Sequence, residues 1–380
     1  MGLALGAVAL AVAASSCGAG ASRQSTAGSS PPSPSAPSST LLSPASSSAA
    51  RGVIRATGSR VDALAVVPGH PRRRIAEWHV CRDRRCYRPT YALTVTSDGF
   101  RTSHVVEVGT SRVANGWYLA PAGPDHFTIA PNGGRRSLVD LRGRVTTIRP
   151  SGAAGPLTGR EVAVRRGKGG FLAVDPDTGA AHPLSTPSGI VELQTTPDGQ
   201  LRGLTFEPAR YYWSSDRGTT WHEIPLPTQD PTVWAELVPT PSSALHVLVL
   251  GGENTVFPWD SVLKSDDGRT WTSYDGPSDP TGYIDDSVVL PDDRLLMNVG
   301  GWSDQTTHRA SVEPVGLWAG TDWSHLGPVA TGAPFQGREP WLVDTVVTGH
   351  LVTLYALAPD QSAVLASTDG GAHWSPVRAR

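Results

Sequence analysis

Short apolar runs separated by turn-forming residues make up the chain beyond residue 51. The runs are about four to eight residues long, as in Arg294–Gly300 and His350–Leu357, and turn signals recur about every eight to twelve residues. Runs of this length between turn signals are typical of strands, whereas an amphipathic helix needs apolar positions spaced by three and four. No helical period of any length follows residue 51. The pattern predicts an all-β domain over residues 51–380, built as a sandwich, a barrel or a propeller.

One octapeptide recurs three times, each time after an apolar run, with the pattern Ser/Thr-x-Asp-x-Gly-x-x-Trp. The second copy has Lys264 in its opening position. The Asp carboxylate and the hydroxyl can accept N–H bonds inside a turn, and Gly provides a positive φ. Trp then enters the next strand and packs between neighbouring elements. The residues expected to shape the three turns are Ser214, Asp216, Gly218, Trp221, Asp266, Gly268, Trp271, Ser367, Asp369, Gly371 and Trp374.

This repeated octapeptide resembles the Asp box, or BNR repeat, of sialidase-like β-propellers. The resemblance implies blades of four antiparallel strands, with each box between the third and fourth strands. Strands assigned outward from the boxes predict seven blades. The predicted blades span residues 62–108, 117–150, 161–187, 190–226, 236–274, 286–323 and 344–377. Six blades are the alternative, if residues 161–187 only elaborate the second blade.

An acidic residue recurs near the start of the first strand in six of the predicted blades. First strands line the centre of a propeller, so these acids predict a ring at one mouth of the channel. The loops between second and third strands are expected on the same face, and the boxes on the other. The candidate ligand face comprises Asp62, Glu161, Glu192, Glu236, Asp286, Asp344, Trp259 and Trp302. The ring either faces solvent without a ligand or attracts a cation or a basic partner segment.

The first fifty residues predict export and tethering. An apolar run over Leu3–Ala13 has the length of a signal-peptide core. Small residues before Cys17 resemble a bacterial lipobox, although Ala14 replaces the usual Leu and no basic residue precedes the run. Residues 1–16 are therefore expected to be a lipoprotein signal peptide, with Cys17 lipidated and the protein on the outer face of the cytoplasmic membrane. Ordinary secretion is the alternative. Residues 17–50 are rich in Ser, Pro and Ala and predict a disordered tether.

Cys81 and Cys86 are the only other cysteines. Disulfides persist in exported proteins, and this spacing suits the two ends of a hairpin. We expect a structural disulfide between them. Two cysteines without neighbouring histidines are a poor zinc site.

The net charge of −2 gives no reason to expect nucleic acid as a partner. No phosphate-binding, dinucleotide-binding, zinc-protease or serine-hydrolase motif occurs, so no catalytic residue, metal or cofactor is predicted. Two functions stay open. One is a monomeric binding or scaffold module for a protein or glycan of the cell envelope. The other, implied by the resemblance, is a sialidase-like glycoside hydrolase, for which Glu207, Tyr211 and Tyr212 are available but unpaired in the sequence.

Overall fold

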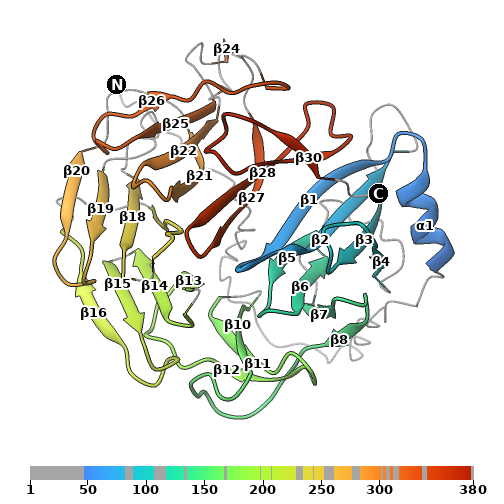
Figure 1. Ribbon diagram of the computed structural model, residues 1–380. Coiled ribbons are helices and arrows are strands. Elements are labelled where there is room, and N and C mark those ends of the chain that lie inside the picture. Colours follow the sequence, from blue (N-terminus) through green and yellow to red (C-terminus); the bar gives the residue numbers. More distant parts are fainter. Residues whose placement is uncertain are drawn as a thin grey trace, which may run out of the picture. The chain divides into compact units, whose positions relative to one another are not determined.

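Seven four-stranded sheets surround a common centre in the part of the chain that can be described (Figure 1). The computed structural model describes residues 47–81, 89–106, 117–131, 135–166, 169–196, 198–206, 208–227, 234–242, 244–251, 261–275, 283–300, 303–304, 309–310, 316–335 and 340–377. The chain divides into two units, Met1–Ser43 and Pro44–Arg380, and every described residue belongs to the second. The prediction of an all-β, seven-bladed propeller is confirmed.

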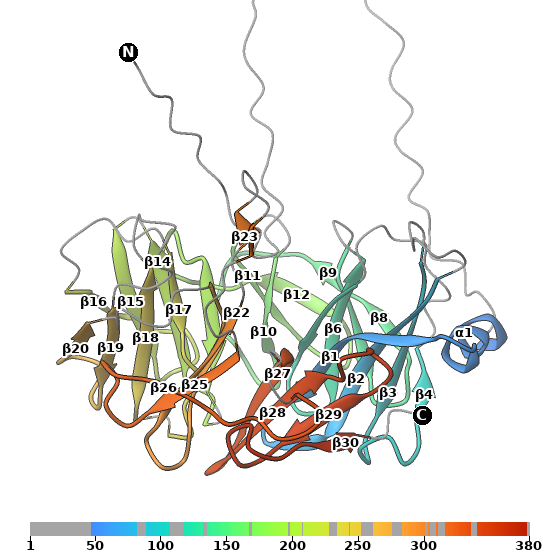
Figure 2. The same ribbon diagram turned by 90° about the horizontal axis from the view of Figure 1, so that it is seen from above.

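The first strand of each blade lies nearest the centre, and the later strands follow outward (Figures 1 and 2). Blade one contains β1 (Arg60–Val67), β2 (His70–Val80), β3 (Thr90–Thr96) and β4 (His104–Val105). Blade two contains β5 (Trp117–Pro121), β6 (His126–Pro131), β7 (Ser137–Asp140) and β8 (Val145–Thr147). Blade three contains β9 (Arg149–Pro150), β10 (Val162–Arg165), β11 (Phe171–Val174) and β12 (Ala180–Pro183).

Blades four to seven carry the three octapeptides. Blade four contains β13 (Glu192–Thr195), β14 (Leu201–Phe206), β15 (Ala209–Ser214) and β16 (His222–Pro225). Blade five contains β17 (Trp234–Leu237), β18 (His246–Gly251), β19 (Ser261–Ser265) and β20 (Thr272–Asp275). Blade six contains β21 (Tyr283–Val289), β22 (Leu295–Gly300), β25 (Gly316–Gly320) and β26 (Gly327–Pro328), with β23 (Ser303–Asp304) and β24 (Arg309–Ala310) paired separately. Blade seven contains β27 (Trp341–Thr348), β28 (Leu351–Leu357), β29 (Val364–Ser367) and β30 (Ser375–Val377).

Blade three departs from the order of the other blades. Its sheet runs β10-β11-β12-β9, so its outermost strand precedes its innermost strand in sequence. β9 pairs in parallel with β12, through Ala180 opposite Arg149 and Ala181 opposite Pro150. Because β10, β11 and β12 form an independent sheet with β9, the alternative of six blades is wrong.

A separate apolar cluster fills each of the seven spaces between neighbouring blades. Between blades five and six, for example, Val249 and Val262 pack with Met297 and Trp318. Between blades seven and one, Leu357 and Val364 pack with Val61, Leu64 and Trp78. Burial of apolar surface between sheets is therefore the main force that holds the ring together.

The ring closes by contact between blades one and seven and not by exchange of a strand. All four strands of blade one come from the start of the described part, and all four of blade seven come from its end. The N–H of Val61 donates to the carbonyl oxygen of Gln361 at 3.1 Å, next to the apolar cluster that the two blades share.

A short helix, α1 (Ser47–Arg55), lies against blade one (Figure 1). Ala50 and Val53 are 1% and 5% exposed and belong to the cluster between blades seven and one. The helix begins inside the range assigned to the tether, which the sequence analysis extended to residue 50. Two apolar positions in nine residues are too weak a periodic signal to reveal a helix that tertiary packing stabilises.

Candidate functional site

The octapeptides of blades four and seven form the same hydrogen-bonded turn between the third and fourth strands. The hydroxyl of Ser214 donates to Asp216 Oδ1 at 2.8 Å and accepts the N–H of Gly218 at 2.8 Å. Ser367, Asp369 and Gly371 repeat these two bonds in blade seven, at 2.8 and 2.9 Å. The side-chain hydroxyl and backbone N–H of Thr220 lower the pKa of Asp216 to about 2, so this acceptor stays ionised.

The turn of blade five uses a different acid from the predicted Asp266. The hydroxyl of Ser265 donates to Asp267 Oδ1 at 3.0 Å, and the N–H groups of Arg269 and Thr270 donate to the same oxygen at 2.7 Å. The alignment on Lys264 and Asp266 is therefore wrong by one residue. This turn is one residue shorter between acid and Trp271 than its counterparts, and Asp267 is the acid that it encloses.

A related turn also occurs in blade one, where the sequence pattern is degenerate. Thr96 Oγ1 donates to Asp98 Oδ1 at 2.8 Å and accepts the N–H of Phe100 at 3.0 Å. Phe100 occupies the position of Gly218 and has φ 67°, a conformation that an aromatic residue rarely adopts. Its ring is 2% exposed in the cluster between blades seven and one, so burial compensates for the backbone strain.

Trp side chains of these turns pack on the preceding blade. The Nε1–H of Trp221 donates to the carbonyl oxygen of Ser185 in blade three at 3.0 Å. Trp271 lies edge-on to Tyr211 of blade four, with ring centroids 5.2 Å apart. The eroded turn of blade six keeps this role, because Trp323 packs on Tyr274 of blade five at 5.4 Å.

Most of the predicted acidic ring serves to join blades. Five carboxylates, named here the inter-blade carboxylates, each accept a hydrogen bond from the first strand of the next blade. The donors and acceptors are Trp117 N to Glu77 Oε1 (3.1 Å), Leu237 N to Glu192 Oε1 (3.3 Å), Ser287 Oγ to Glu236 Oε1 (3.2 Å), Thr345 Oγ1 to Asp286 Oδ2 (2.5 Å), and Val66 N to Asp344 Oδ2 (2.6 Å). The last of these bonds joins blade seven to blade one, where the ring closes.

In blade one the inter-blade carboxylate has moved to the second strand. Ala63, opposite Glu77, follows a bulge in β1, at the register position of Asp286 in β21 and Asp344 in β27. Asp62 lies in the bulge, and its Oδ1 is 3.7 Å from His79 Nδ1. Sequence alignment of the acids could not detect a bulge, so it selected Asp62 and missed Glu77.

Burial raises the pKa of three inter-blade carboxylates. Burial and then the neighbouring charge of Asp62 raise the pKa of Glu77 to about 8. Burial likewise raises the pKa of both Glu192 and Asp344 to about 7. A protonated carboxyl group retains an acceptor oxygen for the N–H of the next blade.

Two predicted ring members lie elsewhere, and several predicted residues lie outside the described part. Glu161 precedes β10, and its Oε2 accepts the N–H and hydroxyl of Thr158 at 2.7 and 2.8 Å. The acids therefore do not form a continuous ring of free carboxylates. The predicted residues outside the described part are Cys17, Cys86, Glu207, Trp259 and Trp302. Cys81 directly follows β2, and its pairing with Cys86 stays a prediction.

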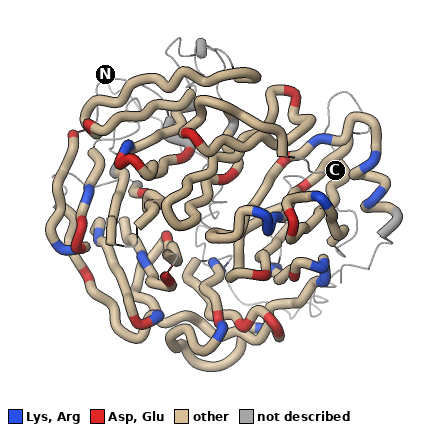
Figure 3. Tube along the Cα trace, viewed as in Figure 1, with Lys and Arg blue, Asp and Glu red and all other residues tan. Residues whose placement is uncertain are grey.

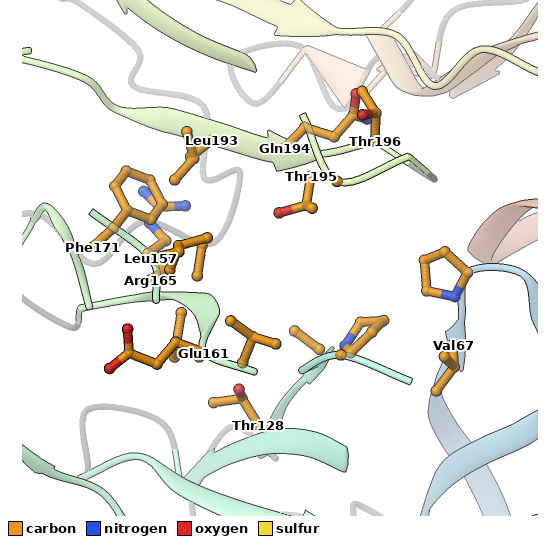
Figure 4. Close-up of a pocket in the computed structure, with 18 of the residues that line it drawn as sticks. Val67, Thr128, Leu157, Glu161, Arg165, Phe171, Leu193, Gln194, Thr195 and Thr196 are labelled. Atoms are coloured by element: carbon orange, nitrogen blue, oxygen red, sulfur yellow. The ribbon is translucent and has the colours of Figure 1, made fainter. Parts of the chain in front are cut away.

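A cavity of about 660 Å³ lies between the first strands of blades two, three and four (Figure 4). β5, β10 and β13 supply its walls, together with the turn that follows Val67 in blade one. Figure 4 shows Val67 across the cavity from Phe171 and Arg165. In the described part of the chain, no inter-blade carboxylate joins blade two to three or three to four. The cavity therefore coincides with the arc of the ring that lacks these bonds.

The predicted face for a ligand does not match the position of this cavity. Its lining includes Arg217 of the blade-four octapeptide and turn residues Pro68, Gly123 and Gly199, which follow first strands. These turns lie at the opposite ends of the first strands from the acids. The octapeptide turns and the cavity are therefore neighbours, whereas the sequence analysis placed the ligand face away from them.

The cavity combines exposed apolar side chains with a cation. Tyr118 and Val191 line it and are 39% and 36% exposed. The exposed Arg165 also lines it, and no carboxylate of the described residues lies within 4 Å of its guanidinium. By contrast, Arg160 pairs with Asp177 at 2.9 Å, and Arg217 donates to the carbonyl oxygen of Glu161 at 2.9 Å. The lining thus offers apolar contact and one cationic donor to an incoming ligand.

The tyrosines considered for glycosidase chemistry lie outside this cavity. Tyr211 is fully buried, and its hydroxyl is hydrogen-bonded to His246 Nδ1. Burial, together with the charge of Arg202, lowers the pKa of His246 to about 4, so the imidazole is neutral at pH 7. Tyr212 lines a different cavity, beside the ion pair of Arg210 and Glu223.

Within the described ranges, no group of three His, Cys, Asp or Glu side chains is placed to hold a metal ion. The same residues include no helix of sufficient length and apolar character to cross a bilayer.

Comparison with solved structures finds propellers of several functions, all at low identity. A puromycin-hydrolysing peptidase of Mycobacterium tuberculosis is 13% identical, with a TM-score of 0.47, 87% of this chain covered and 55% of that chain. Ycf48 from Cyanidioschyzon merolae is 12% identical, with a TM-score of 0.36, 85% of this chain covered and 87% of that one. The GH74 xyloglucanase of Xanthomonas campestris is 16% identical, with a TM-score of 0.37, 84% of this chain covered and 46% of that one. No protein-family model and no curated protein matches the chain.

Proposed function

We propose that this chain is a binding or scaffold module, tethered to the outer face of the cytoplasmic membrane. Its cavity would hold part of a cell-envelope partner, either a protein segment or a glycan. The module would act by holding its partner near the membrane, and it would need no cofactor.

The cavity is the observation that supports a binding role. Of the described large apolar side chains, three are exposed: Tyr118, Val191 and Leu351. Two of these three line the cavity, although it is a small part of the surface. Exposed apolar side chains gathered in a concave site, beside a few polar groups, are typical of ligand sites.

Site-specific photo-crosslinking in the producing cells tests this proposal. A photoreactive phenylalanine analogue placed at Tyr118 or at Val191 should crosslink to the same partner, identified by mass spectrometry. Leu351 is the matched control, because it is 44% exposed but lies in blade seven, outside the lining of the cavity. Equal adducts from Leu351, or no adduct from either cavity position, would contradict a binding site here.

The address is tested separately at Cys17. Replacement Cys17→Ala should abolish incorporation of an alkyne-labelled fatty acid and release the protein from the membrane fraction, because a diacylated cysteine would be its anchor. Labelling that persists in the variant would exclude Cys17 as the lipidated residue. The crosslinking result does not depend on this outcome.

A further inference from the structure

A second, smaller cavity lies at the edge of blade one and is lined mainly by cationic side chains. Its volume is about 350 Å³, and it lies between α1, β3, β4 and the turn that joins β7 to β8. Arg51, Arg55, His104 and Arg142 contribute the basic groups; these four residues are called the arginine pocket below. Figure 3 shows basic positions along α1, at the edge of the ring. No acidic residue lines this cavity.

The fold holds both walls of the arginine pocket in place. On one wall, buried Ala50 and Val53 anchor α1 to blade one, so that Arg51 and Arg55 lie one helical turn apart. On the other wall, Asp140 Oδ1 accepts the N–H of Arg142 at 2.9 Å and fixes the turn. The next residue, Gly143, has φ 81°, and a Cβ atom there would lie 2.7 Å from the carbonyl oxygen of Val105. The Arg142 turn is therefore docked directly on β4.

The neighbouring acids do not neutralise these guanidinium groups. Asp140 pairs with Arg144 at 2.7 Å, and Asp98 is bonded to the hydroxyl of Thr102 at 2.7 Å. Among the described residues, Arg51, Arg55 and Arg142 have no ion pair within 4 Å. Like charges four residues apart on a helix repel each other, and a bound anion would remove that repulsion.

We propose that the arginine pocket binds a phosphate group, and that its source is the headgroup of an anionic phospholipid. Guanidinium groups form bidentate hydrogen bonds with phosphate oxygens, and three that converge from two walls suit a single phosphate. The choice of a lipid rests on the proposed lipid anchor: Arg51 follows Cys17 by only 34 residues. A flexible chain of that length has an end-to-end distance of roughly 30 Å, so the anchor would keep the pocket close to the bilayer.

Each contact with an anionic surface would be weak by itself. A basic residue near such a surface contributes about a fivefold gain in affinity, and salt screens this contribution. A tether converts the second contact into an intramolecular one, so a weak site is still occupied. The headgroup contact would then set the orientation of the propeller at the membrane.

Vesicle binding tests the proposal with the full chain carrying Cys17→Ala, so that acylation plays no part. The protein should sediment with vesicles of phosphatidylcholine containing 30% phosphatidylglycerol, and not with phosphatidylcholine alone. The net charge of −2 gives no general attraction to such vesicles. The double variant Arg51→Ala/Arg55→Ala should lower the vesicle affinity by roughly 25-fold. The control Arg166→Ala/Arg269→Ala removes the same charge from two exposed residues outside the pocket and should have little effect.

A second arm identifies the source of the phosphate. Sodium phosphate should raise the melting temperature of the parent protein more than sodium chloride of equal ionic strength, and the pocket variant should lose this difference. A phosphate effect without vesicle binding would retain the phosphate site and reject the lipid as its source. Equal vesicle binding by the pocket and control variants, with no specific phosphate effect, would overturn the proposal.

Should the double variant fail to fold, Arg142→Ala serves in its place, because the backbone of that turn is held by Asp140. Failure of Cys17 lipidation would leave the phosphate arm unchanged, so the two proposals fail separately.

Discussion

Asp266 and Asp267 are adjacent carboxylates in the blade-five turn that differ in the contacts they make. Asp267 accepts hydrogen bonds from Ser265, Arg269 and Thr270. The backbone N–H groups of Thr270 and Arg269 lower the pKa of Asp267 to about 2. Among the described residues, Asp266 has no hydrogen bond or ion pair. The pair therefore offers a comparison within one turn.

We expect Asp267→Ala to lower the melting temperature by a few degrees, because two backbone N–H groups lose their acceptor. Asp266→Ala should change it little. Thermal unfolding of both variants at pH 7 measures the difference. A larger effect at Asp266 would support the original alignment on Lys264.

A residue type and spacing can predict a turn but not its register. In blades four and seven the pattern and the hydrogen bonds agree, because the turn has its full length. In blade five one residue fewer separates the acid from Trp271, and two neighbouring aspartates both fit a loose pattern. Only the direction of the Ser265 hydroxyl distinguishes them.

At the level of strands, Glu77 is the clearest test of the inter-blade carboxylates. It is 2% exposed, and it accepts the N–H of Trp117, the first residue of β5. Glu77→Ala should lower the free energy of unfolding by roughly 1–3 kcal/mol, because the buried N–H is left without an acceptor. Glu77→Gln keeps an acceptor oxygen and should cost less. Urea denaturation of both variants compares them, and equal losses would show that the bond contributes nothing.

The raised pKa values of Glu77, Glu192 and Asp344 predict a stability that falls with rising pH. The folded protein keeps these protons up to pH 7 or 8, whereas the unfolded chain releases them near pH 4 to 4.5. The folded state thus binds more protons, and its stability declines as the pH rises to about 8, by at most about 1.4 kcal/mol per pH unit for each group.

This pH effect is best measured between pH 6.5 and 8.5. The lowered pKa of His246 acts in the opposite direction, but only below its unfolded value of about 6.5. The variant Glu77→Gln/Glu192→Gln/Asp344→Asn should show a flatter curve than the parent protein over the measured range. Parallel curves for the two proteins would contradict the raised pKa values.

At the level of the whole ring, the two arcs should differ in local stability. Inter-blade carboxylates link blades four to seven and close the ring onto blades one and two, whereas blade three has none among its described residues. Blade three also has first, second and third strands of only four residues each. We expect amides of β10 to exchange with deuterium sooner than those of β18, β22 and β28. Uniform protection around the ring, measured by mass spectrometry, would contradict this expectation.

Most of the ring could be predicted from the sequence because its repeats are local. The octapeptides mark three blades directly, and strand lengths supply the others. The cavity could not be predicted in this way, since Tyr118, Arg165 and Val191 belong to no motif and meet only when three blades assemble. The acids were recognised by position, but their partners lie on the next blade, 40 to 59 residues away where the ring does not close.

The strand order of blade three also decides where the ring can be cut. Residues 192–225 form the whole of blade four in one continuous segment, so a deletion with a single junction removes that blade intact. Deletion of residues 162–183 would leave β9 attached to blade two without the β12 edge on which it pairs. A change in blade number by loss or duplication of one segment is therefore open at the other blades but not at blade three. In protein engineering, blades two and three have to be moved as one module.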